Sequence, residues 1–129
     1  MTTATAIPCA LVVEDEMLVA MMLERVLSTL GYRVIKAARV AKAVHFASTE
    51  AIDVAILDVN LAGEPSYEGA ETLRRRGIPF VIASGYDPER LPPEWRDIAL
   101  LRKPYTPRDV AQSLSAAAAS RGPTGNRKR

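Results

Sequence analysis

The stretch "VAILDVN", residues Val54 to Asn60, decides the fold class of this chain. Its four apolar residues, Val54 to Leu57, predict a strand that is covered on both faces, because a half-exposed strand would alternate apolar and polar residues. Strands of this kind are typical of parallel sheets with helices on both faces. The apolar run stops at Asp58, so a carboxylate directly follows a buried strand.

Short apolar runs alternate with helical patterns along the rest of the chain. This alternation predicts βα units and a doubly wound parallel sheet, which is an α/β fold. Strands are expected over residues 10–13, 33–37, 54–57, 80–83 and 98–101, and helices over 16–30, 40–49, 68–76 and 106–120. A fourth helix between the last two strands should be short or irregular, because Pro92 and Pro93 cannot lie inside a helix.

Length and composition indicate one domain, which we place at residues 8–120, followed by a disordered basic tail at 121–129. The chain has 129 residues, and its formal charge of +2 is too small to favour nucleic acid as a partner. Cys9 is the only cysteine, which excludes an internal disulfide and fits a reducing compartment. No apolar run approaches the roughly 20 residues that cross a membrane. We therefore expect a cytoplasmic protein with no membrane or nucleic-acid partner.

Polar residues stand at the ends of the predicted strands. Glu14 and Asp15 follow the first strand, Asp58 follows the third, and Ser84 follows the fourth. Lys103 lies just after the fifth strand. The carboxyl ends of the strands in a doubly wound sheet share one edge, where ligands bind. The sequence therefore predicts one small site that contains three carboxylates, a hydroxyl and an ammonium group.

These groups favour phosphoryl transfer to a carboxylate. Clustered carboxylates raise one another's pKa unless a cation joins them, and Mg²⁺ binds such groups while keeping positions for phosphate oxygens. Lys103 adds a positive charge that can bind an anion, and a carboxylate can act as the nucleophile. His45 is the only histidine and is predicted to lie in the middle of a helix, so no histidine base is expected at the site.

Four motifs together resemble the receiver domains of two-component response regulators. They are "VVEDE" with Glu14 and Asp15, "ILDVNLAG" with Asp58, "ASGY" with Ser84, and "RKPY" with Lys103. The motifs follow one another in the family's order, and the resemblance extends from residue 10 to about residue 119. It implies a flavodoxin-like, five-stranded parallel sheet with the strand order 2-1-3-4-5.

The resemblance also implies a metal site. Asp58 is the implied phosphoacceptor. Asp15, Asp58 and the main-chain carbonyl of Asn60 are the implied ligands of Mg²⁺, and Glu14 is implied to assist through a water molecule.

Two further roles follow from the same resemblance. Lys103 is implied to bind the phosphoryl group, and Ser84 is implied to move towards it when phosphate arrives. The implied donor is a phosphohistidine on a histidine kinase or a histidine phosphotransfer protein. The downstream protein target is unknown.

The sequence departs from the family at one position. Typical receivers carry an aromatic switch residue three positions before the lysine, where this chain has Leu100. Tyr86 and Tyr105 are the candidate replacements, although Tyr86 could instead only cover the pocket. The stretch "PFVIASGYD" resembles the "FATGY"-type strand of a subgroup of stand-alone receivers, whose fourth helix is often poorly formed. Gly85 would give this loop freedom to move.

The first predicted helix offers a docking surface. A helical wheel places Leu23, Leu27 and Leu30 on its core side, and Met17 and Met21 on its outer side. Exposed methionines suit adaptable docking, and the first helix of receivers commonly meets the phosphodonor. The alternative is that both are ordinary surface residues.

We expect a single-domain response regulator that signals through protein contacts, since only residues 121–129 follow the last predicted helix. Alternatives are a phosphorelay shuttle or phosphate sink, and a pseudo-receiver that acts without phosphorylation. A phosphatase of the haloacid dehalogenase type is disfavoured, because its aspartates follow strand one whereas Asp58 follows strand three. No enzyme activity is expected beyond self-catalysed phosphotransfer and autodephosphorylation. The kinase, the signal, the lifetime of the acyl phosphate and phosphorylation-dependent dimer formation stay open.

Overall fold

The computed structural model describes residues 7–85 and 90–121 of the chain. Within these residues, the main sheet consists of five parallel strands in the order β2-β1-β3-β6-β7. Their bounds are β1 (Cys9–Val13), β2 (Arg33–Ala37), β3 (Val54–Asp58), β6 (Phe80–Ser84) and β7 (Leu100–Arg102). The predicted α/β fold and the strand order 2-1-3-4-5 are therefore confirmed.

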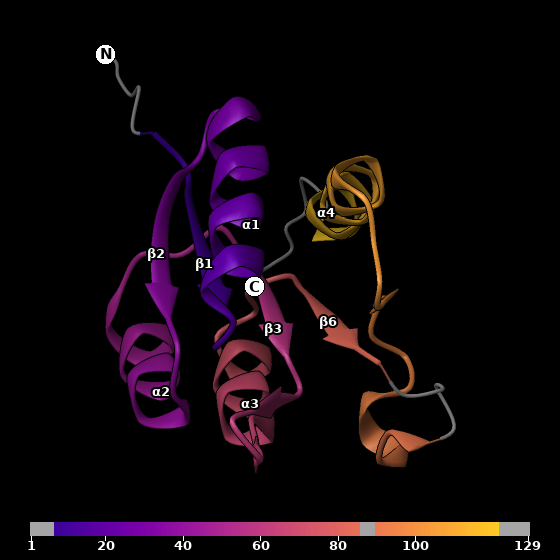
Figure 1. The fold of residues 1–129 in the computed structure, drawn as a ribbon. Helices are drawn as coiled ribbons and strands as arrows, with labels where there is room; N and C mark the ends of the chain where they lie inside the picture. Colours follow the sequence, from indigo (N-terminus) through magenta and orange to yellow (C-terminus); the bar gives the residue numbers. More distant parts are fainter. Residues whose placement is uncertain (1–6, 86–89, 122–129) are drawn as a thin grey trace.

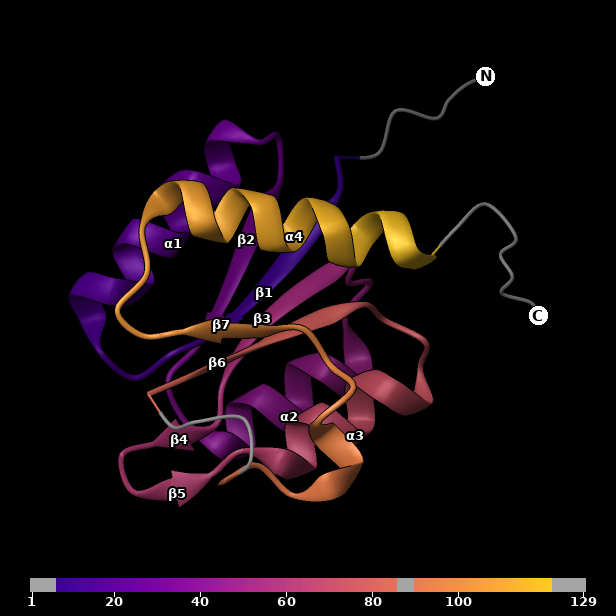
Figure 2. The ribbon, with the colours of Figure 1, turned by 90° about the vertical axis from the view of Figure 1, so that its right-hand side faces the viewer.

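Helices cover both faces of the sheet (Figure 1). One face carries α1 (Met17–Thr29) and α4 (Pro107–Arg121), and the other carries α2 (Val40–Thr49) and α3 (Tyr67–Arg75). Figure 2 shows these layers from the side, with α1 and α4 above the sheet. None of the helices in the described ranges has the length and apolar character needed to cross a membrane. Residues 122–129 of the predicted tail lie outside the described residues.

Strand β3 lies at the centre of the core. All five of its residues are buried. Val54 and Ile56 pack into the cluster beneath α1 and α4, whereas Ala55 and Leu57 pack into the cluster beneath α2 and α3. Alternate side chains of a strand point to opposite faces, so a strand covered on both faces requires an unbroken apolar run. This requirement explains the sequence from Val54 to Leu57.

The core side of α1 differs from the predicted stripe at Leu30. Ala20, Leu23 and Leu27 are buried, but Leu30 is 45% exposed. The prediction that Leu30 belongs to the core stripe was wrong, because the helix ends at Thr29 and Leu30 is its C-cap residue. Leu18, which the wheel did not single out, is 77% exposed.

In the described residues between β6 and β7, the chain forms the 3-10 turn η2 (Pro93–Trp95) and no α-helix, as the two prolines predicted. Trp95 is buried beneath this turn and is 3% exposed. Its ring lies parallel to the ring of Tyr67, with centroids 6.2 Å apart, and meets the ring of Phe80 edge-on at 6.3 Å. Trp95 therefore packs η2 against α3 and β6.

We predict that Trp95→Ala lowers the free energy of unfolding by about 3–5 kcal/mol, because it removes a large buried side chain and leaves a cavity. Trp95→Phe should lower it by less, since the smaller ring still fills part of the space. Urea denaturation followed by circular dichroism measures both changes. A loss below about 1 kcal/mol for Trp95→Ala would contradict the buried position of this side chain.

Candidate functional site

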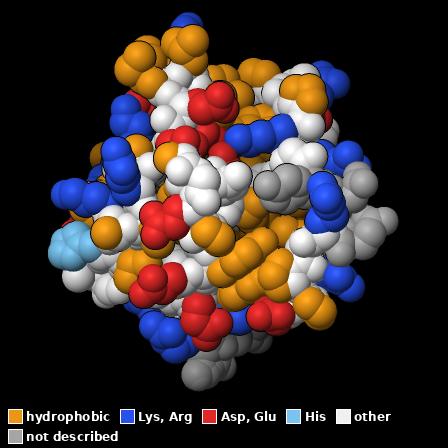
Figure 3. Space-filling view, turned by 60° about the horizontal axis from the view of Figure 1, so that its bottom comes forward, with side chains coloured by type: hydrophobic (Ala, Val, Ile, Leu, Met, Phe, Trp, Pro, Cys, Tyr) orange, Lys and Arg blue, Asp and Glu red, His pale blue; other side chains and the backbone are white. Residues whose placement is uncertain are grey.

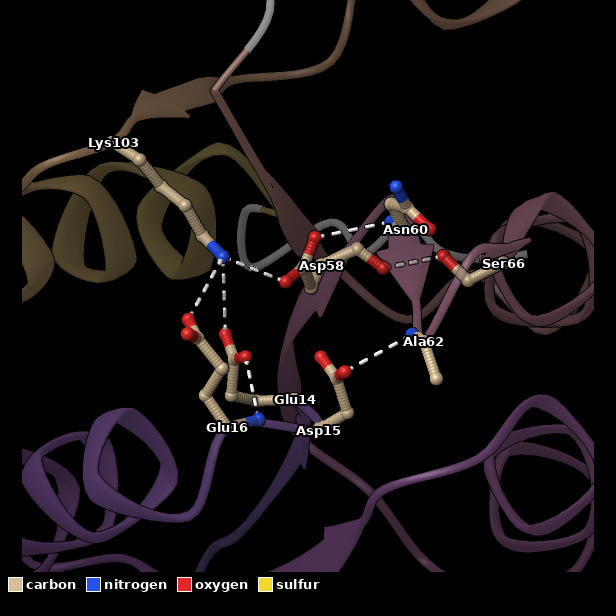
Figure 4. A network of polar contacts seen from close by, with 8 residues as sticks. All are labelled: Glu14, Asp15, Glu16, Asp58, Asn60, Ala62, Ser66 and Lys103. Atoms are coloured by element: carbon tan, nitrogen blue, oxygen red, sulfur yellow. Dashed lines mark hydrogen bonds and ion pairs between the residues drawn. The ribbon is translucent and has the colours of Figure 1, made fainter.

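Polar side chains lie at four strand ends along the carboxyl edge of the sheet, and Figure 4 shows those of β1, β3 and β7. Glu14 follows β1, Asp58 and Ser84 are the last residues of β3 and β6, and Lys103 follows β7. The structure thus brings together the residues that the sequence placed at strand ends. A hollow of about 330 Å³ opens there, lined by Asp15, Glu16, Asp58, Val59, Asn60, Ala62, Gly63, Ser84, Gly85 and Lys103. In Figure 3, which turns this edge forward, acidic side chains gather beside a basic one.

The ammonium group of Lys103 is the centre of the charge network. Its Nζ lies 2.7 Å from Asp58 Oδ2, 3.5 Å from Glu14 Oε1 and 4.0 Å from Glu16 Oε1. Burial lowers the pKa of Lys103, but the hydrogen bond to Asp58 and the neighbouring negative charges outweigh this effect, and the pKa is raised overall. Lys103 therefore stays charged. Its position is fixed by its own N–H, which donates to the carbonyl of Ser84 at 2.9 Å.

Main-chain N–H groups orient the three carboxylates. Asp58 Oδ1 accepts from the N–H of Asn60, Asp15 Oδ2 accepts from the N–H of Ala62, and Glu14 Oε2 accepts from the N–H of Glu16, each at 3.0 Å. Such bonds hold the other oxygen of each carboxylate in a fixed direction.

A short hairpin that the sequence analysis missed supplies part of this arrangement. Strand β4 (Asn60–Leu61) pairs antiparallel with β5 (Glu64–Pro65). The two residues between them, Ala62 and Gly63, both have positive φ values, 51° and 87°. Two such residues form the tight turn that suits a two-residue hairpin. The turn directs the N–H of Ala62 towards Asp15. The glycine in "NLAGEP" is the sequence feature that could have indicated this turn.

Glu14, Asp15 and Asp58 can each offer one oxygen to a single cation. These oxygens lie within 4.8 Å of one another. Glu14 Oε1 is buried, and it has no hydrogen bond among the described residues. A hard divalent cation with oxygen ligands fits this donor set, because it would neutralise clustered carboxylates. The arrangement is of the kind that holds Mg²⁺ in receiver domains.

Burial controls the protonation of Glu14. The side chain is almost completely buried, and this loss of water raises its pKa to about 7. The charges of Asp58 and Asp15 raise the pKa further, while the N–H of Glu16 and the charge of Lys103 oppose the increase. Without a cation, Glu14 is therefore partly protonated near neutral pH.

The candidate aromatic switch residues lie in different surroundings. Tyr105 is half-buried beside Lys103, and its hydroxyl is buried without a hydrogen-bond partner in the described part of the chain. Burial and the nearby charge of Glu14 raise the pKa of Tyr105 to about 12, so the hydroxyl is neutral. Leu100 is half-buried in β7 and packs against the core beneath α2 and α3. Tyr86 lies outside the described residues.

Two residues at the site were missed by the sequence analysis. Glu16 lines the hollow and lies within 4.0 Å of Lys103, and it appeared in the "VVEDE" motif without a role. Ser66 donates its hydroxyl to the main-chain carbonyl of Asp58. It is separated from Asp58 by the hairpin, and no local pattern in the sequence indicates this contact.

Comparison with known proteins identifies the class. The model of the response regulator receiver domain family matches residues 10–114. The solution structure of SdrG from Sphingomonas melonis Fr1 is 42% identical, with a TM-score of 0.76, and the match covers 88% of this chain and 98% of that one. The BeF3-activated conformation of SdrG from Pseudomonas melonis Fr1 is 40% identical, with a TM-score of 0.72 and coverage of 89% and 99%.

A response regulator receiver protein from Sinorhizobium medicae WSM419 is 25% identical, with a TM-score of 0.78 and coverage of 90% and 98%. No curated protein matches the chain. The chain belongs to the response regulator receiver domain family. Members of this family act in two-component signalling, where they accept phosphoryl groups from histidine kinases and are not conventional enzymes.

We predict that the stability of the metal-free protein falls as pH rises from about 4.5 to about 7, owing to Glu14. The pKa of Glu14 is higher in the folded chain than in the unfolded chain, so the folded state binds more protons in this range and loses stability as they dissociate. Glu14→Gln does not titrate. The free energy of unfolding of Glu14→Gln, measured relative to that of the wild type, should therefore increase by up to about 3 kcal/mol as the pH rises through this range.

Urea denaturation in the presence of a chelator measures this difference. Glu71→Gln, on the exposed side of α3, is the control and should give a pH curve parallel to that of the wild type. Parallel curves for Glu14→Gln and the wild type would show that Glu14 is not responsible for the pH dependence.

Proposed function

We propose that the chain is a single-domain response regulator that accepts a phosphoryl group on Asp58 and signals through protein contacts. The observation that carries this proposal is the position of Asp58 at the end of β3. Asp58 is only 5% exposed, and its carboxylate faces the hollow. Its Oδ2 lies 2.7 Å from Nζ of Lys103. A nucleophile, a cation and an acidic cluster thus share one small site.

Mg²⁺ is the cofactor that this site would hold. Asp15, Asp58 and the main-chain carbonyl of Asn60 would be its ligands, and Glu14 would act through a water molecule. When bound, the ion supplies charge neutralisation for the carboxylates and for phosphate oxygens. The receiver domain of the sensor histidine kinase PA1611 from Pseudomonas aeruginosa PAO1 has a magnesium ion coordinated in its active-site cleft.

The transfer itself requires little acid–base chemistry. A carboxylate oxygen of Asp58 attacks the phosphorus of a phosphohistidine, an O–P bond forms, and the N–P bond breaks with its electron pair returning to the imidazole. Lys103 stabilises the transferred oxygens by its charge, and Ser84 donates a hydrogen bond to them. Transfer of this kind depends on positioning and electrostatics, which the fixed carboxylates and Lys103 provide.

The output of this receiver would not use the usual aromatic switch, since Leu100 stands in its place. Tyr105 is the candidate replacement within the described residues, because its hydroxyl lies near the charges of Glu14 and Lys103. Tyr86 remains the second candidate. The similarity to the BeF3-activated SdrG structure supports a site that responds to a group bound at the phosphoacceptor.

We predict that the wild-type protein gains the mass of one phosphoryl group when it is incubated with acetyl phosphate and Mg²⁺. Asp58→Asn should gain none, because an amide is a poor nucleophile. Asp15→Asn and removal of the metal should both slow the reaction. Intact-protein mass spectrometry measures each result.

Asp97→Asn is the matched control, since Asp97 lies on the surface after η2 and pairs with Arg74. It should be phosphorylated like the wild type. Phosphorylation of Asp58→Asn at the wild-type level would disprove the assignment of the phosphoacceptor. No gain by the wild type, both with acetyl phosphate and with a phosphohistidine protein, would favour the pseudo-receiver.

A groove beside the site suits the helix of a phosphodonor. It is lined by Glu16, Val19, Met22, Lys103, Pro104 and Tyr105, so two of its residues also line the hollow around Asp58. Met17, Leu18 and Met21 on α1 are more than half exposed. A helix lying on α1 would therefore reach Lys103 and Asp58 at one end. We assign this surface to a histidine kinase or a histidine phosphotransfer protein.

We predict that Met21→Glu slows phosphoryl transfer from a phosphohistidine protein by about tenfold, which corresponds to about 1.4 kcal/mol of docking energy. The rate with acetyl phosphate should not change, because Met21 does not line the hollow. Ala41→Glu places the same charge on the exposed side of α2 and is the control. Equal rates for Met21→Glu and Ala41→Glu with the phosphohistidine donor would place the docking surface elsewhere.

Mass spectrometry of the receiver together with the phosphohistidine donor protein distinguishes a shuttle or phosphate sink from an effector. A shuttle returns its phosphoryl group to the histidine of the donor protein, which appears as a loss of mass from the phosphorylated receiver and a gain by the donor.

A further inference from the structure

Ser66 links the end of β3 to the start of α3. Its side chain is fully buried, and its hydroxyl donates to the main-chain carbonyl of Asp58 at 2.5 Å. The N–H of Ser66 donates to the carbonyl of Val59 at 3.0 Å. Serine at a helix N-cap usually binds a main-chain N–H of the first turn, but Ser66 makes no such bond to α3. The hydroxyl instead ties the candidate phosphoacceptor to this helix (Figure 4).

The next residue, Tyr67, contacts Trp95. The two rings are nearly parallel, with an angle of 6° between their planes. Trp95 also meets Phe80 of β6, and the guanidinium group of Arg74 lies 4.3 Å from the centre of its ring. Trp95 therefore lies between α3 and the sheet, in contact with Tyr67, Phe80 and Arg74.

Arg74 joins α3 to the turn η2. Its Nη1 donates to the main-chain carbonyl of Glu94 at 2.9 Å, and its Nη2 donates to Asp97 Oδ1 at 3.1 Å. Together with the ring contact to Trp95, these bonds fix η2 on α3. A displacement of the first turn of α3 would therefore reach η2 through Tyr67, Trp95 and Arg74.

We propose that Ser66 and Tyr67 transmit the state of Asp58 to Trp95, so that η2 changes its packing when Asp58 is phosphorylated. A phosphoryl group adds volume and negative charge at Asp58, and the short bond from Ser66 couples the main chain there to α3. A closely packed interior passes such a shift on instead of absorbing it. The inference rests on the proposed function, because it requires phosphate or a mimic at Asp58.

The fluorescence of Trp95 provides the test, since it is the only tryptophan in the chain. The protein is titrated with beryllium fluoride in the presence of Mg²⁺, and binding is measured separately from the ¹⁹F NMR signal of the bound fluoride. We expect the emission of the wild type to change in parallel with binding. Ser66→Ala should bind beryllium fluoride but lose more than half of the emission change.

Two further variants complete the test. Thr72→Ala removes another buried hydroxyl of α3, which donates to the carbonyl of Glu68 and does not contact Asp58, and it should keep the full emission change. Tyr67→Leu keeps the Ser66 bond but removes the ring from Trp95, and it should lose the change while retaining binding. Tyr67→Leu carries the test alone if Ser66→Ala does not fold.

The outcomes separate this inference from the proposed function. If Ser66→Ala and Tyr67→Leu keep the full emission change, the signal travels along the chain from Ser84 instead, and the inference is overturned. Binding by the wild type without any emission change also overturns it. Absence of a bound fluoride signal in the wild type contradicts the proposed function itself.

Discussion

One ammonium group shared by two buried carboxylates is the interaction on which the site depends. Asp58 and Glu14 stand at the ends of covered strands, where a charge without a partner would be very costly. Lys103 lies 2.7 Å from Asp58 and 3.5 Å from Glu14, which offsets part of this cost. Asp15 and Glu16 add further negative charge that Lys103 does not balance. Burial is the main cause of the raised pKa of Glu14, and the charges of Asp58 and Asp15 raise it further. The cluster of carboxylates around Lys103 also fits a divalent cation.

The sheet makes this arrangement of charges unavoidable. Parallel strands that are covered on both faces consist of apolar residues along their length, so polar side chains can appear only where the strands end. Because β1, β3, β6 and β7 run in the same direction, their polar ends meet at one edge. The β4–β5 hairpin then closes this edge by directing the N–H of Ala62 to Asp15 and the N–H of Asn60 to Asp58.

The sequence predicted the features that depend on local pattern. The apolar run of β3, the prolines before Trp95 and the polar residues at strand ends each have a direct physical meaning. The hairpin was missed because Ala62, at a positive φ, is an unusual turn residue. Arg76 donates to the carbonyls of Ala47 and Glu50 at the end of α2, which no feature of the sequence indicated. Such contacts join segments distant in sequence, and no local pattern encodes them.

The proposed input and output surfaces of the site lie on opposite layers of helices. The groove beside α1 opens onto Lys103 from one face of the sheet, whereas Ser66 reaches the main chain of Asp58 from α3 on the other face. A donor lying on α1 would therefore leave α3 and η2 uncovered. An acceptor of this kind can be phosphorylated and read by different partners without competition for one surface. Leu100 would fit this division, because its half-buried aliphatic side chain would not have to turn if the signal left through α3.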